Sequence, residues 1–259
     1  MILRRLTRSL KEQNWTAIII EFVLLVVGVL LAMQVNNWNQ QRITDQQAAI
    51  YTKHLREDLR IEAWQLTGLN RYYDEVLANA NRTLEDLEGS ASLSNEAFLV
   101  AAFRATQYSD FVQNRGTYDE LVSTGNIGLI SDSRLRRMAI ETYGTKLYEN
   151  VRTEGINSQY RTTFRMLVPV KVQTAIGKLC GDRTTRINDY ESLKVVLDYP
   201  CSTGLSQRDI DSAASTLRAD RTMAPLLRLR ITNIHSAVGT TVISDDVMNG
   251  LRAFSAGKP

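Results

Sequence analysis

The stretch WTAIIIEFVLLVVGVLLAMQVNNW, residues 15–38, decides how this chain is organised. It is an apolar run that begins at Trp15 and ends at Trp38, and Glu21 is its one charged residue. At about 1.5 Å per residue, a helix of this length spans roughly 34 Å, enough for a bilayer core of roughly 30 Å. Tryptophan has an apolar ring and a polar N–H, so it settles at the membrane–water boundary. The pattern predicts one transmembrane helix over residues 15–38, anchored at both interfaces; a buried helix of a soluble domain is the alternative.

Basic residues are distributed unevenly around this run. Four of them precede it: Arg4, Arg5, Arg8 and Lys11. Only Arg42 is basic in the segment VNNWNQQRITDQQ that follows. Because positive residues are retained in the cytoplasm, we expect residues 1–14 to form a cytoplasmic tail and residues 39–259 a periplasmic domain. No small-x-small cleavage site follows the run, so it is expected to remain as a single-pass anchor in a bacterial inner membrane rather than to be removed as a secretory signal.

One face of the predicted membrane helix combines small residues with the glutamate. By helical spacing, this face contains Glu21, Leu25, Gly28, Ala32 and Val35. Gly28 and Ala32 form a small-xxx-small pair, which lets two helices approach closely. One interpretation is that a partner helix packs here, from a second copy or from another membrane protein, and that Glu21 finds a hydrogen-bond donor across the contact. In the other interpretation, Glu21 reaches the cytoplasmic lipid headgroups or is neutral.

The residues after the anchor predict a helical body. From Tyr51 onward, apolar residues recur with heptad spacing at two positions. One position contains Leu59, Leu66, Tyr73, Ala80 and Leu87; the other contains Leu55, Leu69 and Val76, with Glu62 and Thr83 as exceptions. This predicts a long helix over about 43–88, and the mixed second position suits a bundle better than a dimeric coiled coil. Shorter helices are expected at about 96–108, 118–124, 132–168, 171–179, 189–197, 206–218 and 224–252.

The predicted fold class is therefore all-α, with one N-terminal transmembrane helix that continues into a periplasmic helical bundle over about 94–252. No sustained strand alternation is present, although the segment GTTVISD is β-branched and could be extended. Weak points in the helix expected at about 132–168 are Gly144 and Gly155. A left-handed cap is expected at Gly125 and Asn126, where the helix at about 118–124 stops.

The chain contains two cysteines, Cys180 and Cys201. In the oxidising compartment that the topology predicts, such a pair tends to form a disulfide, which contributes about 3 kcal/mol for a loop of this size. Two free buried thiols are the alternative. A zinc site is disfavoured because His54 and His235 lie far away in the sequence and no further cysteine is available.

Composition and motifs give little support to catalysis. Of the 259 residues, 23% are charged and 44% are apolar, which is ordinary for a globular protein. The net charge of +3 is too small to indicate nucleic-acid binding. The sequence contains no GxSxG elbow, HExxH pair or P-loop. We expect His54 on a solvated helix face and His235 in the core or at its boundary. The sequence therefore predicts no catalytic residue, no metal site and no cofactor.

The segment TYDELVSTGN is the best candidate for a recognition site. Tyr118, Ser123, Thr124 and Asn126 lie at a turn between helices, where binding groups often sit. The alternative is structural: Tyr118 and Leu121 pack in the core, while the other three side chains satisfy helix ends.

Two motifs resemble an uncharacterised bacterial family of single-pass membrane proteins. The anchor is similar to the pattern E-x-x-L-x-V-x-G-x-L-x-A-x-Q-x-N-N-W-N at Glu21, Leu24, Val26, Gly28, Leu30, Ala32, Gln34, Asn36, Asn37, Trp38 and Asn39. The second pattern, T-Y-x-E-L-x-S-S-G-N-L-x-L-I, is matched at Thr117, Tyr118, Glu120, Leu121, Ser123, Gly125, Asn126, Leu129 and Ile130, with Thr124 and Ile127 as departures. The resemblance covers roughly the first 150 residues. It implies a mostly helical, single-pass membrane protein and carries over no catalytic residue.

Three functions are compatible with these features. The first is a non-enzymatic, membrane-anchored accessory or scaffold protein that contacts lipid and binds another membrane protein or itself. The second is a periplasmic ligand-binding or sensor module, and the third is an enzyme on an unrecognised helical scaffold. The absence of a catalytic grouping, together with the small-residue face, favours the first.

Overall fold

The computed structural model describes residues 15–109, 111–239, 249–251 and 253. The described residues are mostly helical and contain no strand, which confirms the all-α prediction for this part of the chain. By their contacts, the residues divide into two compact units, Met1–Thr52 and Lys53–Pro259. Helix α2, Trp15–Leu87, contributes residues to both units.

The first unit contains the apolar run. It meets the length and composition of a membrane-spanning helix, and none of its apolar window is buried by the rest of the chain. The core helix of a soluble protein is mostly buried, so this exposure does not support the alternative of a core helix. The basic residues expected in the cytoplasmic tail lie outside the described part of the chain.

The second unit is built on the part of α2 that follows Lys53, and the heptad prediction is confirmed here. Every residue at the two predicted positions is buried except Leu87, which is half-buried at the end of the helix. The two polar exceptions, Glu62 and Thr83, are fully buried as well. Thr83 satisfies its hydroxyl by donating to the carbonyl of Asn79 at 2.8 Å. The helix ends before Gly89, whose φ of +77° suits glycine.

Ten shorter helices lie in the described part of the second unit, besides a helical fragment at residues 249–251. The α-helices are α3 (Asn95–Arg104), α4 (Gly116–Ser123), α5 (Ser133–Gly144), α6 (Leu147–Asn157), α7 (Gln159–Leu167), α8 (Val170–Cys180), α9 (Gln207–Ala219) and α10 (Met223–Gly239). The 3-10 helices are η1 (Asn126–Leu129) and η2 (Glu191–Leu193). In three of the α-helices a capping side chain accepts a hydrogen bond from the first turn: Ser94 in α3, Asp132 in α5 and Ser206 in α9.

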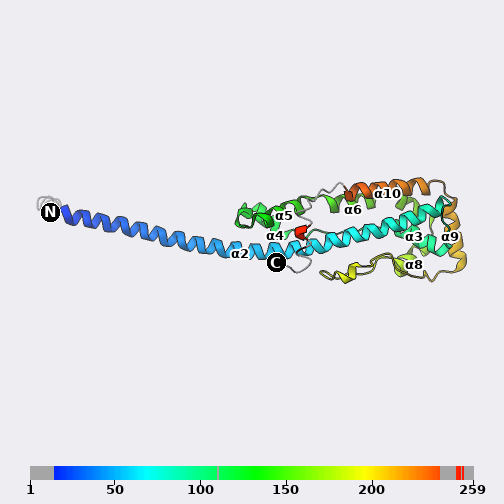
Figure 1. Ribbon diagram of the computed structural model, residues 1–259, viewed down its shortest axis with the longest axis horizontal. Helices are drawn as coiled ribbons and strands as arrows, with labels where there is room; N and C mark the ends of the chain where they lie inside the picture. Colours follow the sequence, from blue (N-terminus) through cyan, green and yellow to red (C-terminus); the bar gives the residue numbers. More distant parts are fainter. Residues whose placement is uncertain (1–14, 110, 240–248, 252, 254–259) are drawn as a thin grey trace. The chain divides into compact units, whose positions relative to one another are not determined.

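The core forms where these helices pack together. Helix α10 lies beside α6 and α7, and α9 contacts α3, α7 and α8. Figure 1 shows α5, α6 and α10 on one side of this part of α2 and α8 on the other. Apolar side chains of α3, α7, α8, α9 and α10 form one continuous cluster that also contains Ala80 of α2.

Two expected helices are wrong in part. The helix expected at about 132–168 is broken twice, once after Gly144 as anticipated and once at Ser158 instead of Gly155. Gly155 lies inside α6 against Tyr108, where a β-carbon would come within 2.3 Å of that side chain. Ser158 ends α6 because its side chain caps α7 by accepting from the backbone N–H of Arg161.

The other difference concerns the helix expected at about 189–197. Only η2 forms within the helix expected at about 189–197, because backbone N–H groups at the end of that segment bond to the carboxylate of Glu75. Helix α10 is described only to Gly239, so most of the GTTVISD segment lies outside the described residues.

Glu62 is buried at a heptad position because its carboxylate has partners there. One oxygen accepts from the backbone N–H of Asn114 at 2.6 Å, and the other accepts from the hydroxyl of Tyr148 at 3.1 Å. Burial raises the pKa of Glu62, and these two hydrogen bonds oppose the shift. The polar exception in the heptad pattern is therefore the point where α2 binds the segment that precedes α4.

Substitutions at Glu62 test this role. Glu62→Ala leaves the N–H of Asn114 and the hydroxyl of Tyr148 without their acceptor, so we expect a loss of about 3 kcal/mol in the free energy of unfolding. Glu62→Gln keeps one acceptor and adds a donor for the oxygen of Tyr148 without a buried charge. We therefore expect it to be at least as stable as the wild type at neutral pH.

The pH dependence has a defined sign. Because the pKa of Glu62 is higher in the folded than in the unfolded chain, the folded protein binds more protons between those two values, and stability falls as the pH rises through that window. Glu62→Gln should lack this component. Urea unfolding of the full-length protein in detergent, followed by circular dichroism at several pH values, measures both effects; equal stability of the alanine variant and the wild type would contradict the assignment.

Candidate functional site

The predicted recognition turn is positioned by carboxylates of α2. Asn114 donates its backbone N–H to Glu62 and its side-chain amide to Asp58 at 2.9 Å, and its carbonyl accepts from the hydroxyl of Tyr143 at 3.0 Å. The backbone N–H of Thr117 donates to the second oxygen of Asp58 at 3.3 Å. Asp58 and Glu62 are one turn apart, so both face the same segment. The start of α4 is therefore held by side chains far away in the sequence.

The four predicted residues have different environments in this turn. Tyr118 is half-buried, and its ring centroid lies 5.0 Å from that of Tyr143. The hydroxyls of Ser123 and Thr124 both donate to the carbonyl of Glu120, at 3.2 and 2.7 Å. Asn126 is exposed at the start of η1. The two hydroxyls satisfy the end of α4, as the structural interpretation expects, and a binding role for the turn stays a prediction.

Gly125 makes the turn possible. Its φ of +71° places it in the left-handed region between α4 and η1, which confirms the expected cap. Gly128, three residues later, has an ordinary φ, and a β-carbon there would meet nothing within 4 Å. Leu121, one turn before the glycine, is fully buried and fixes α4 to the body.

The predicted disulfide is present. Cys180 ends α8 and Cys201 lies in the loop before α9, with their Cα atoms 5.5 Å apart. Cys180 is fully buried in the core, whereas Cys201 is half-buried beside it. Attack by an external thiolate on the more accessible sulfur of Cys201 would expel the thiolate of Cys180 into apolar surroundings, which disfavour charge. This arrangement fits a structural crosslink better than one that exchanges readily.

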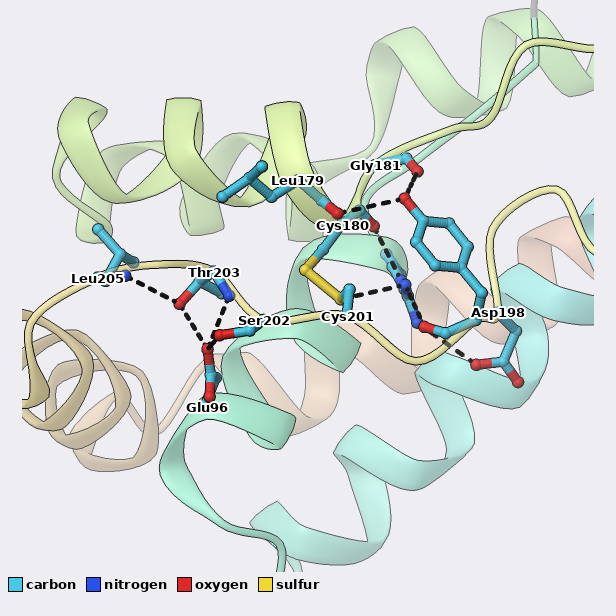
Figure 2. Close-up of a disulfide and its surroundings, with 11 residues drawn as sticks. Glu96, Leu179, Cys180, Gly181, Asp198, Cys201, Ser202, Thr203 and Leu205 are labelled. Atoms are coloured by element: carbon cyan, nitrogen blue, oxygen red, sulfur yellow. Dashed lines mark hydrogen bonds and ion pairs between the residues drawn. A yellow bond between two sulfur atoms is a disulfide. The ribbon is translucent and has the colours of Figure 1, made fainter.

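Charged side chains of α3 hold the loop around the disulfide, as Figure 2 shows. Arg104 donates to the carbonyl of Cys180 at 3.0 Å and to that of Tyr199 at 2.9 Å. At the other end of α3, one oxygen of Glu96 accepts from both the backbone N–H and the hydroxyl of Thr203, each at 2.7 Å. The loop is thus fastened at two points by one helix, in addition to the disulfide.

A cavity of about 560 Å³ lies beside this loop, between α2, α3 and residues 198–201. Arg82 contacts Asp198 at 2.6 Å, and the same carboxylate lies 3.5 Å from Arg104. Each of these charged groups is matched within the protein, so the cavity presents little net charge to a ligand. Sequence reasoning missed Glu96 and Arg104; their only signal is that they flank the apolar run AFLVAAF.

The histidines do not form a site in the described part of the chain. His54 is exposed, as expected. His235 is also exposed, which corrects the expectation of a core or boundary position: its neighbour Ile234 takes the inward position and is fully buried. Among the described residues, no group of three His, Cys, Asp or Glu side chains is arranged to hold a metal ion.

The residues of the predicted partner face are all exposed. This holds for Glu21, Leu25, Gly28, Ala32 and Val35, and also for the two flanking tryptophans, Trp15 and Trp38. A β-carbon at Gly28 would meet nothing within 4 Å in this chain. None of the described residues therefore covers this face.

Alanine substitutions at two glycines test the geometry of the turn. Gly125→Ala forces a side chain into the left-handed region, so we expect a loss of about 1 kcal/mol in the free energy of unfolding. Gly128→Ala is the matched control and should be neutral or slightly stabilising. Urea unfolding of the full-length protein measures both, and equal losses in the two variants would argue against the turn described here.

Removal of the disulfide tests how much the loop depends on it. The double variant Cys180→Ser/Cys201→Ser should lose about 3 kcal/mol in the free energy of unfolding. Because Glu96 and Arg104 also hold the loop, we expect its helical content at low temperature to match the wild type. A large loss of helical circular dichroism without denaturant would show that these contacts are insufficient.

Comparison with known proteins identifies one family, whose function is unknown. A family model described as a family of unknown function, DUF6090, matches residues 21–189. This region includes the partner face, the recognition turn and Cys180, but not Cys201. Searches of curated proteins and of solved structures find no match. The match covers well over half of the length of this chain, which therefore belongs to the DUF6090 family of unknown function.

Proposed function

We propose that this protein is a membrane-anchored, non-enzymatic accessory or scaffold protein that binds a partner membrane protein through its anchor and its periplasmic helices. Gly28 carries this proposal. It lies in mid-helix without a positive φ, and no neighbour among the described residues requires a residue without a β-carbon there. Glycine in a helix interior costs about 1 kcal/mol relative to alanine. A glycine at this position would allow the backbone of a second helix to approach closely.

Glu21 supports the same face. An ionisable side chain within a membrane helix costs about 3 kcal/mol near the centre, and less toward the ends. Glu21 is two turns before Gly28, so a donor on a partner helix could bond to it at the contact. The remaining faces of the anchor are apolar and suit lipid, with Trp15 and Trp38 at the two boundaries.

The orientation is part of the proposal. Positive residues before the anchor favour a cytoplasmic N-terminus in a bacterial inner membrane, which leaves the helical body in the periplasm. The disulfide between Cys180 and Cys201 supports this side, because disulfides persist in the periplasm and are rare in the cytosol.

A second candidate function is a periplasmic ligand-binding or sensor module. The observation that favours it is a polar cavity between α6 and α10 in the helical body. The two functions are compatible, since a partner bound through the anchor could carry the response to a ligand.

Substitutions on opposite faces of the anchor test the scaffold function. Gly28→Ile places a branched side chain on the partner face and should reduce photo-crosslinking to the partner by at least about tenfold, a loss of about 1.4 kcal/mol in binding. Leu30→Ile, on the opposite face, is the control and should crosslink like the wild type. Blue-native gels of native membranes provide an independent readout. A wild-type protein that is strictly monomeric in both assays would refute the proposal.

A further inference from the structure

A second site is suggested by the groove where α6 and α10 lie side by side. The groove encloses about 430 Å³ and is open to solvent, a volume within the usual range for small-molecule sites. It is lined from three directions: by α6, by the start of α7 and by α10. From the chemistry of this lining, we infer that the groove binds a small, neutral, polyhydroxylated ligand of the size of a mono- or disaccharide.

The floor of the groove is a buried ion pair. The side chains of Arg230 and Glu154 are 1% and 8% exposed, and one terminal nitrogen of the guanidinium lies 3.1 and 2.9 Å from the two carboxylate oxygens. Arg230 also donates to the carbonyls of Ala105 and Gln107, at 2.5 and 2.6 Å. The guanidinium is held from three sides, so its orientation is fixed before any ligand arrives. The two charges cancel, which favours a ligand without net charge.

The rim of the groove is rich in amides. Asn150 and Asn157 on α6 and Asn233 on α10 are exposed and line it, together with hydroxyl and amide side chains at Thr153, Ser158, Gln159 and Ser236. An amide side chain offers both donors and an acceptor, and a sugar hydroxyl is likewise both donor and acceptor. No charged side chain other than the ion pair lines the groove, so nothing in it selects an anion or a cation.

Apolar contact is available on one side. Leu226 and Leu229 line the groove, and Leu229 is 45% exposed. The C–H face of a sugar ring can pack on such side chains while its hydroxyls reach the amides. Tyr160 is 1% exposed and donates its hydroxyl to the carbonyl of Ala102, so its ring serves as wall and not as a stacking surface.

The same polar pattern could also suit the backbone of an extended peptide, but the geometry favours the smaller ligand. The groove is compact, and the charged pair at its floor is buried and matched within the protein, so the exposed amides of the rim are the groups that a ligand meets. This inference goes beyond the proposed scaffold function and does not depend on it. A protein that fails to crosslink through its anchor could still bind a saccharide, and the converse also holds.

Binding of defined probes to the full-length protein tests the inference. The protein is reconstituted in nanodiscs or in a detergent without a sugar headgroup, because maltoside headgroups would compete. Maltose and N,N′-diacetylchitobiose are the saccharide probes, with N-acetyl-trialanine amide and inorganic phosphate as the peptide and anion probes. Ligand-observed NMR and calorimetry measure binding. We expect at least one saccharide to bind, and neither of the other probes to bind as tightly.

Matched variants locate the site. Asn150→Ala/Asn233→Ala should weaken saccharide binding at least about tenfold, and Asn157→Ala gives an independent second test on the same rim. The control Asn70→Ala/Asn81→Ala changes two exposed asparagines of α2 outside the groove and should bind like the wild type. All five positions are exposed, so circular dichroism should be unchanged. No saccharide binding, binding unaffected by both rim variants, or preferred binding of the peptide or of phosphate would each overturn the inference.

Discussion

The helical body depends on buried and half-buried carboxylates of α2 that accept hydrogen bonds from backbone N–H groups outside the helices. Glu62 accepts from Asn114, and Glu75 accepts from the N–H groups of residues 196–198. An irregular segment packed against a core has backbone groups that water no longer reaches, and leaving them unpaired is costly. Carboxylates on a long helix provide the missing acceptors at fixed positions. The helix α2 therefore organises both the segment before α4 and the loop that contains the disulfide.

Arginines supply the complementary donors. Arg230 and Arg161 bond to the carbonyls of Ala105, Thr106 and Gln107 just after α3 ends, where the helix dipole favours positive charge. In this way α3, α7 and α10 are joined by polar contacts as well as by the apolar cluster. The same Arg230 pairs with Glu154 and so also forms the floor of the polar groove between α6 and α10. A body fixed in this manner suits the presentation of a surface to a partner or to a small ligand.

The elements that could be predicted from the sequence are those governed by local spacing and capping. The heptad pattern of α2, the caps at Ser94, Asp132 and Ser206, and the turn at Gly125 are all readable within a few residues. The position of Gly155 inside α6 and the irregular segment around η2 could not be predicted because each depends on a distant partner: Gly155 packs against Tyr108, and Glu75 accepts hydrogen bonds from the N–H groups of the loop. The groove was missed because polar residues on α6 and α10 look like solvated faces until the helices are placed together.

The position of the disulfide loop along the chain has a consequence for biosynthesis. Glu75, Glu96, Arg104 and Cys180, which together receive the loop, all precede residue 196 in the sequence. A polypeptide that leaves a translocation channel with its N-terminal part first would therefore expose these four residues before the loop that they bind appears. Cys201 would then meet the thiol of Cys180 before α9 and α10, which complete the core cluster that contains Cys180, have emerged. Oxidation at that stage would join α8 to the loop before the core is complete, and the chain would spend little time with one unpaired cysteine exposed to other nascent proteins.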